Sequence, residues 1–347
     1  MIRVLLVEDS VVTREYLSHL LGQDPAIEVV GTARDGVEAV EQAQRLKPDL
    51  VLMDVHMPRM NGYEATRQIM ERSPAPIVMI SASLDQGEVA MTFAALEAGA
   101  LTVLPKPVGP GHPLHADSTR KVVETVKLMA EVKVVRRWPK RDSPPAPIPS
   151  LDAGERRVRL VAIGASTGGP PAVAEILKGL PADLGFPILF VQHIAPGFAG
   201  GLVEWLRQVT PLAVKLAEPD ELVQAGSVYV AADGAQMGIT RQGRIRVTNE
   251  AAPDGFCPSV SHLFESAAEA YGRAALGVLL TGMGRDGAAG LRRLREAGGL
   301  TIAQDEESSV VFGMPQEAIR LGAAEKVLNP SEIGQAIRAL ARTATGA

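Results

Sequence analysis

The sequence predicts an α/β protein with two doubly wound, parallel-sheet domains joined by a proline-rich linker. Short aliphatic runs alternate with amphipathic stretches of helix length, which is the pattern of βαβ units. Aromatic residues make up only 4% of the 347 residues, so the 46% hydrophobic content is mostly aliphatic, as in buried parallel strands. Prolines cluster at residues 138–150 and divide the chain.

Composition excludes several classes of protein. The 35 Lys+Arg and 40 Asp+Glu residues give a net charge of −5, so no overall basic field favours a nucleic-acid partner. Cys257 is the only cysteine, which excludes an intramolecular disulfide and fits a reducing cytoplasm. The apolar run at residues 4–7 is too short for a signal peptide, and the longest uncharged stretch, residues 185–203, contains prolines and glycines. We expect a soluble, cytoplasmic protein without direct membrane insertion.

The first domain contains five aliphatic runs that we interpret as strands. They lie at residues 4–7, 27–30, 50–53, 77–80 and 101–104. Residues 118–137 have apolar positions at helical spacing, among them Val122 and Val126, so a closing helix is expected to end at the linker. The prolines that follow remove backbone donors and favour extended conformations, which indicates a semi-rigid linker.

The second domain also contains five aliphatic runs. They lie at residues 160–163, 187–191, 227–230, 276–280 and 300–303. In open parallel sheets, ligands bind beyond the carboxyl ends of the strands. The residues that follow each run are therefore the first candidates for a functional site in both domains.

Polar side chains follow four of the five predicted strands in the first domain. They are Glu8, Asp9, Asp54, Ser81 and Lys106. Three carboxylates at one sheet edge suit Mg²⁺, which would allow Asp54 to act as a nucleophile towards a phosphoryl group. Lys106 could then pair with the resulting phosphate. Each acid alone could be a solvated loop residue, but five suitable side chains at strand ends disfavour that alternative.

In the second domain, residues 163–170 follow a predicted strand and open a helical stretch. Their Gly-x-Ser-x-Gly pattern suits a sharp turn that projects Ser166 and gathers backbone N–H groups. Ser166 could therefore attack a carbonyl. From the motif alone, an anion-binding turn without chemistry is an equal alternative.

A serine nucleophile needs a base and an orienting acid. His193 ends a strand whereas His262 lies in a helix, so position favours His193. Asp286 and Asp305 both follow strands, and we favour Asp286 because glycines flank it. Cys257, a rival nucleophile, has no histidine at a matching strand end. The order Ser, His, Asp disfavours an α/β-hydrolase fold.

On this interpretation His193 takes the proton of Ser166, Asp286 orients the imidazole, and water releases an acyl-enzyme. Backbone N–H groups of Thr167 and of the loop around Met283 are the candidate oxyanion donors. The glycines of that loop could instead serve only a tight turn, and the Met283 side chain only packing. The ester chemistry requires no cofactor.

The first domain, residues 1–125, resembles the receiver domain of bacterial response regulators, which has a flavodoxin-like fold. The resemblance implies that Asp54 is the phosphoacceptor and that Glu8, Asp9 and Asp54 bind the metal. It also implies that Ser81 is the hydroxyl switch and that Lys106 pairs with the phosphate. It also implies a cis bond at Lys106–Pro107. Val103 stands where receivers often carry an aromatic switch residue.

Residues 126–156 are expected to be the helix end and the linker. Residues 157–343 resemble the catalytic domain of the chemotaxis protein-glutamate methylesterase/glutaminase family, which is a Rossmann-like α/β domain. The matching segments are residues 163–170, 192–193, 258–260, 280–287 and 303–315. The family's catalytic residues fall on Ser166, His193 and Asp286.

The resemblance implies that γ-glutamyl methyl esters of methyl-accepting chemotaxis receptors are hydrolysed to release methanol, and that selected receptor glutamines are deamidated. It further implies a chemotaxis histidine kinase as phosphodonor and a receiver that covers the cleft until Asp54 is phosphorylated. Residues 229–237 and Cys257 depart from the family pattern beside the cleft, so the resemblance implies the reaction class but not the receptor specificity. One alternative is a phospho-dependent interaction protein whose esterase domain serves docking, and another is the same chemistry in a different chemosensory pathway.

Overall fold

The computed structural model describes residues 1–81, 93–132, 134, 157–249 and 255–344. The chain divides into two compact units, Met1–Ser143 and Pro144–Ala347. Most of the predicted linker, residues 135–156, lies outside the described residues. No helix within the described ranges combines the length and apolar character needed to cross a membrane.

The first unit contains a parallel sheet whose strand order, over the described residues, is β2-β1-β3-β4-β5. The strands are β1 (Ile2–Val7), β2 (Ile27–Ala33), β3 (Leu50–Asp54), β4 (Ile77–Ser81) and β5 (Thr102–Pro105). Each overlaps a predicted run, and the predicted fold class is confirmed. The aliphatic side chains of β1, β3 and β4 form the buried core of this unit.

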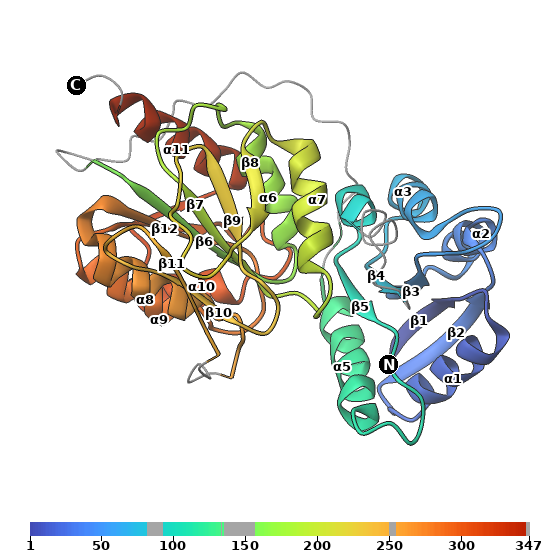
Figure 1. Cartoon of the computed structure of the whole chain (residues 1–347). Coiled ribbons are helices and arrows are strands. Elements are labelled where there is room, and N and C mark those ends of the chain that lie inside the picture. The colour runs from blue at the N-terminus through green and yellow to red at the C-terminus, as the bar shows by residue number, and fades with distance from the viewer. Residues whose placement is uncertain (82–92, 133, 135–156, 250–254, 345–347) are drawn as a thin grey trace. The chain divides into compact units, whose positions relative to one another are not determined.

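Helices cover both faces of this sheet. They are α1 (Val11–Gly22), α2 (Gly36–Leu46), α3 (Gly62–Arg72) and α5 (His115–Ala130). Figure 1 shows the sheet between the pair α1 and α5 and the pair α2 and α3. Helix α5 ends at Ala130, so the prediction that it reaches residue 137 is wrong. The last helical residues, Leu128, Met129 and Ala130, favour helix more than the β-branched Val132 and Val134 that come after them.

The second unit contains a larger parallel sheet with the order β14-β13-β12-β6-β7-β9-β8 among the described residues. The strands are β6 (Leu160–Ala165), β7 (Ile188–Gln192), β8 (Ala213–Leu216), β9 (Ser227–Val230), β12 (Ala275–Leu279), β13 (Leu300–Gln304) and β14 (Lys326–Leu328). Strand β6 lies between β7 and β12. From β6 the strands are therefore added first towards one edge of the sheet and later towards the other edge. Such a switch point opens a crevice at the carboxyl ends of the strands.

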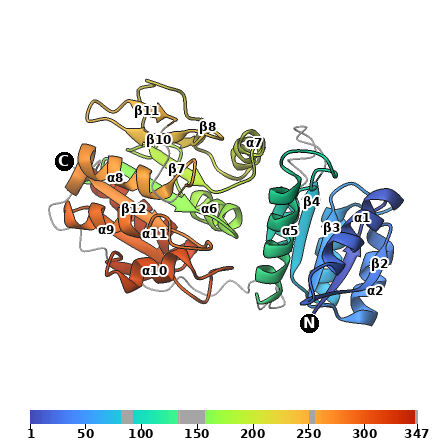
Figure 2. The same ribbon diagram turned by 90° about the horizontal axis from the view of Figure 1, so that it is seen from below.

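Helices also cover this sheet, as Figures 1 and 2 show. They are α6 (Gly169–Lys178), α7 (Ala199–Val209), α8 (Val260–Tyr271), α9 (Ala288–Glu296), α10 (Met314–Arg320) and α11 (Pro330–Ala344). An antiparallel ribbon of β10 (Gln236–Ile239) and β11 (Ile245–Thr248) packs near α8. Strands β8, β10, β11 and β14 were not predicted, because they are only three or four residues long and have no extended aliphatic run.

Candidate functional site

The carboxyl edge of the first sheet brings three acids together. Oxygen atoms of Glu8, Asp9 and Asp54 all lie within 4.8 Å of one another. Glu8 and Asp54 are buried, whereas Asp9 is exposed at the mouth of the cluster. Strands β1 and β3 are neighbours in the sheet, so the residues at their ends meet at one edge. The predicted convergence of these side chains is present.

Lys106 lies between two of these acids. Its Nζ atom is 2.8 Å from a carboxylate oxygen of Asp54 and 2.8 Å from one of Glu8. Burial raises the pKa of both Glu8 and Asp54, and the ammonium group offsets only part of this effect. Burial alone would lower the pKa of Lys106, but its hydrogen bonds to Asp54 and Glu8 outweigh burial and raise it.

The charge balance of this cluster favours a cation. Three carboxylates face one ammonium group in the cluster, and oxygen is the donor that Mg²⁺ prefers. The two buried acids resist ionisation in the absence of further positive charge. Glu8, Asp9 and Asp54 therefore fit a divalent metal site.

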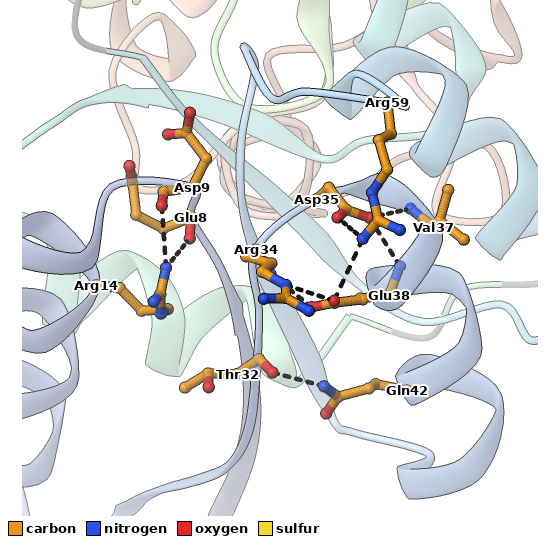
Figure 3. Close-up of polar contacts among 10 residues, drawn as sticks. All are labelled: Glu8, Asp9, Arg14, Thr32, Arg34, Asp35, Val37, Glu38, Gln42 and Arg59. Carbon is orange, nitrogen blue, oxygen red and sulfur yellow. Dashed lines mark hydrogen bonds and ion pairs between the residues drawn. The ribbon is translucent and has the colours of Figure 1, made fainter.

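Two arginines hold the loops around this cluster (Figure 3). The Arg14 guanidinium donates to the backbone carbonyls of Glu8, at 2.6 Å, and Asp9, at 3.2 Å. Arg59, in the loop after β3, forms an ion pair with Asp35 at the start of α2. These contacts fix the β1–α1 loop and tie the loop after Asp54 to α2.

The other candidate residues of the first unit lie in or directly after β4 and β5. Ser81 is buried, and its carbonyl accepts a hydrogen bond of 2.8 Å from the backbone N–H of Lys106. Val103 is buried in β5. The expected cis bond at Lys106–Pro107 is wrong, because the cis bond of the described residues is Cys257–Pro258. Lys106–Pro107 has the trans form, which X–Pro bonds favour by about 0.5–1 kcal/mol.

In the second unit, Ser166 occupies a sharp turn between β6 and α6. Its backbone N–H donates to the carbonyl of Thr281 at 3.0 Å. Gly168 has φ +79°, and a Cβ atom there would lie 2.5 Å from Val310. Both its backbone conformation and its surroundings therefore require glycine. The turn places Ser166 at the switch point of the sheet.

His193 and Asp286 come from the two strands that flank β6. His193 directly follows β7, and its backbone N–H donates to the carbonyl of Ala165 at 2.9 Å. Its Nε2 atom lies 2.9 Å from Asp286 Oδ2, which leaves Nδ1 as the nitrogen available to Ser166. Within the described residues, no hydrogen bond joins the Ser166 hydroxyl to His193. The structure thus pairs His193 with Asp286 beside the turn of Ser166.

Asp286 is buried at the N-terminus of α8 and accepts several hydrogen bonds there. The donors and distances are Ser259 Oγ at 3.0 Å, Val260 N at 2.7 Å, Ser261 N at 3.0 Å and Gly287 N at 2.8 Å. Burial alone would raise the pKa of Asp286, but its interactions with His193 and Ser261 hold that pKa well below the usual range. The partial positive charge of the helix N-terminus acts in the same direction.

Several residues that support the site were not predicted from the sequence. Phe256 stacks on the imidazole of His193 with ring centroids 4.5 Å apart and planes within 3°. Thr281 Oγ1 donates to the carbonyl of Thr167 at 2.9 Å. No sequence periodicity marks an aromatic in a loop or a single buried threonine. Ser259, however, carried a signal, because a serine directly before a helical pattern is a typical N-cap.

The other candidates take different positions. Asp305 accepts hydrogen bonds from the N–H and hydroxyl of Ser308 within its own turn, so it serves a local structure there. His262 lies in the first turn of α8, where its N–H donates to Ser259 Oγ at 3.3 Å. Cys257 and Met283 are both exposed.

Comparison with known families matches both units. Residues 161–337 match the CheB methylesterase family, and residues 4–116 match the response regulator receiver domain. The catalytic domain of CheB methylesterase from Thermotoga maritima has a similar structure, with a TM-score of 0.51 and 36% identity. That match covers 53% of this chain and 98% of the solved one.

Relatives of the same length are similar over both units. Protein-glutamate methylesterase/protein-glutamine glutaminase 4 of Geobacter metallireducens is 53% identical over 345 residues, which cover 98% of this chain and 99% of the relative. The protein-glutamate methylesterase/protein-glutamine glutaminase of Nitrosospira multiformis is 51% identical over 341 residues, covering 97% and 96%. From these matches we conclude that the chain belongs to the CheB methylesterase family and carries a response regulator receiver domain ahead of its catalytic domain.

Proposed function

We propose that this protein is a phosphorylation-activated serine hydrolase of chemosensory adaptation. It removes γ-glutamyl methyl esters from methyl-accepting chemotaxis receptors, releases methanol and deamidates selected receptor glutamines. The observation that carries the proposal is the His193–Asp286 pair, 2.9 Å apart, beside the Ser166 turn at the switch point of the sheet. The two relatives described above, about half identical over nearly the whole chain, are named for both activities.

Acyl transfer to Ser166 accounts for both reactions. His193 takes the proton of the Ser166 hydroxyl through Nδ1, because Asp286 holds Nε2. The Ser166 oxygen attacks the γ-carbonyl of the substrate, and His193 returns the proton to the leaving group, which departs as methanol or ammonia. Water then hydrolyses the acyl-enzyme by the reverse sequence of proton transfers. Asp286 stays ionised throughout and stabilises the imidazolium, as its lowered pKa requires.

The oxyanion is stabilised by backbone donors of the two loops that border Ser166. The proposed donors are the N–H groups of Thr167 and Met283, neither of which donates to another group within the described residues. Loss of one such donor typically lowers the rate by about 10²–10³-fold. The exposed Met283 side chain would contact the substrate beside the cleft.

The receiver provides the control. Asp54 accepts a phosphoryl group from the chemotaxis histidine kinase. Glu8, Asp9 and Asp54 would hold Mg²⁺, which would supply positive charge beside the phosphoryl oxygens. Lys106 leaves its ion pair with Asp54 to bind the phosphate, and Ser81 donates its hydroxyl to a phosphate oxygen. These rearrangements bias the receiver towards the state that permits substrate access.

The proposal is tested by measuring methanol release from methylated receptor membranes. The full-length protein is assayed with and without a small-molecule phosphodonor and Mg²⁺, and ammonia release is followed with amidated receptors. Ser166→Ala is the control and is expected to lose at least about 10³-fold of the rate. Release that needs Ser166 and rises with the phosphodonor supports the proposal. Absence of release from folded wild-type protein under every condition contradicts it.

A further inference from the structure

Gln192 connects the residue proposed as nucleophile to the residue proposed as base. It ends β7, directly before His193, and the residue is only 5% exposed. The side-chain Nε2 donates to the carbonyl of Ser166 at 2.7 Å and to the carbonyl of His193 at 2.9 Å. A single amide group therefore joins the Ser166 turn to the backbone of His193.

We propose that Gln192 is a positioning residue for acyl transfer, which fixes the Ser166 turn relative to His193 and orients the Thr167 peptide group. The inference rests on the proposed roles of Ser166, His193 and Thr167. Gln192 acts through these three residues and contacts neither the substrate nor the reacting atoms.

Peptide geometry connects the Gln192 side chain to the N–H of Thr167. The carbonyl of Ser166 accepts hydrogen bonds from Gln192 and from the N–H of Gly169, the latter at 2.9 Å. The C=O and N–H groups of a planar trans peptide point in opposite directions. Fixing the carbonyl of Ser166 therefore fixes the N–H of Thr167 on the side away from Gln192. This N–H is the proposed oxyanion donor.

Thr281 holds the peptide groups on either side. Its carbonyl accepts from the N–H of Ser166 at 3.0 Å, and its Oγ1 donates to the carbonyl of Thr167 at 2.9 Å. Three successive peptide groups of the turn are thus held by side-chain or backbone partners. Of the two side chains that hold the turn, that of Gln192 also binds the backbone of His193, whose own N–H donates to the carbonyl of Ala165.

The surroundings of the Gln192 side-chain oxygen show that packing does not require an amide at this position. Its Oε1 atom is buried and has no hydrogen-bond partner among the described residues. It fills the space beside Gly169, where a Cβ atom would lie 2.2 Å away. A buried acceptor without a partner is unfavourable, and an apolar side chain of similar size would avoid that cost. The amide is therefore explained by its two donated hydrogen bonds rather than by packing.

The test uses Gln192→Leu and, as a second variant, the unbranched Gln192→Met, both in the full-length protein. Thr210→Val is the matched control, because Thr210 is also buried and donates to a backbone carbonyl, that of Leu177 at 3.1 Å. Three quantities are measured for each: kcat and KM for methanol release, the thermal midpoint, and the rate of Ser166 labelling by a fluorophosphonate. In that labelling, Ser166 Oγ forms a bond to phosphorus, fluoride leaves and His193 takes the proton.

We expect kcat and the labelling rate of both Gln192 variants to fall about 10- to 100-fold, with KM changed by less than about twofold. Thr210→Val should lower the thermal midpoint and keep kcat within about twofold. Folded Gln192 variants with wild-type kcat and labelling would overturn the inference, as would a loss confined to KM. Wild-type protein that is labelled at Ser166 but releases no methanol would contradict the proposed function, while the labelling rates would still decide the role of Gln192.

Discussion

At the scale of single residues, burial raises the pKa of the key carboxyl group in both sites, and the partners of that group decide the outcome. Asp286 is buried but ionised, because His193 and the donors at the start of α8 compensate its lost hydration. Asp54 is also buried, yet its pKa is raised, because Lys106 is shared with Glu8 and does not compensate fully. The surroundings of Asp286 suit a carboxylate that stays charged and orients His193. The surroundings of Asp54 suit a carboxyl group whose ionised form is stabilised by added positive charge.

Asp286→Asn is expected to lower kcat for methanol release by about 10³-fold or more, because the imidazolium loses its charged partner. Since the pKa of Asp286 is lowered on folding, its stabilising contribution is complete at neutral pH and is lost as the pH falls below about 4. Asp286→Asn should therefore lower the free energy of unfolding, measured in urea, by more at pH 7 than at pH 3. Asp305→Asn is the control and should keep its kcat.

Asp54→Asn is expected to raise the thermal midpoint of the receiver unit at pH 7 in the presence of EDTA. Because the pKa of Asp54 is raised on folding, ionisation of its carboxyl group destabilises the folded unit as the pH rises through that pKa. The difference in midpoint between Asp54→Asn and wild type should therefore shrink as the pH falls towards about 4. Asp24→Asn should change the midpoint in the opposite direction, because Lys127 lowers the pKa of Asp24. Equal midpoints for wild type and Asp54→Asn would contradict the predicted charge penalty.

At the scale of elements, the N-terminus of α8 serves both folding and chemistry. Ser259 is the N-cap, and its hydroxyl accepts from the N–H of His262 while donating to Asp286. The N–H groups of the first turn bind the same carboxylate. One helix end therefore supplies donors that a buried Asp286 needs in order to remain charged.

Ser259→Ala should lower the free energy of unfolding of the catalytic unit by about 1–2 kcal/mol, because α8 loses its cap. It should also lower kcat, because Asp286 loses a donor. Ser10→Ala is the matched control, since Ser10 caps α1 by accepting from Thr13 N at 3.4 Å. This variant should lose stability without a change in basal methanol release. A Ser259→Ala protein with unchanged kcat would show that the cap acts on folding alone.

At the scale of the whole molecule, each unit has a sheet and a core of its own. A catalytic domain similar to the second unit has been solved as a separate chain, which supports its independent folding. Separate cores allow the proposed regulatory and catalytic roles to belong to different units. The proposed domains, residues 1–125 and 157–343, correspond to these two roles, and residues 126–156 connect them.

Removal of residues 1–156 should raise basal methanol release if the unphosphorylated receiver restricts access to the cleft. Typical coupling energies between sites correspond to a change of about 5–150-fold. The truncated protein should no longer respond to a phosphodonor and Mg²⁺, and full-length Asp54→Asn should remain at the basal rate. An unchanged basal rate after truncation would contradict restriction by the receiver.

Much of the fold could be predicted from the sequence because most buried parallel strands are continuous aliphatic runs. All ten predicted runs overlap strands. The short strands β8 and β14 lie at the edges of the large sheet, and β10 and β11 form a separate ribbon. Edge strands and ribbons pair on fewer sides, so they need no long apolar run. The end of α5 was missed for a different reason, since apolar spacing continues beyond the last helical residue.

The side chains of the candidate sites could also be located from the sequence, because polar residues after buried strands are confined to one edge of a parallel sheet. Ser166, His193 and the receiver acids were found in this way. The residues that hold them in place were not. Phe256, Thr281 and the amide of Gln192 act through contacts between segments far apart in the chain, and no local pattern records such contacts.

The sequence by itself determined the fold class, the strand ends that carry chemistry and the family resemblance, because these depend on local composition and spacing. It favoured Asp286 as the partner of His193, although strand ends alone also allowed Asp305. The tertiary structure decided between them through strand order: β12 lies next to β6, whereas β13 lies one strand further away, about 4.8 Å more distant. Asp286 therefore reaches His193 and Asp305 closes its own turn. Strand order arises from packing of the whole sheet and is not encoded in any single segment.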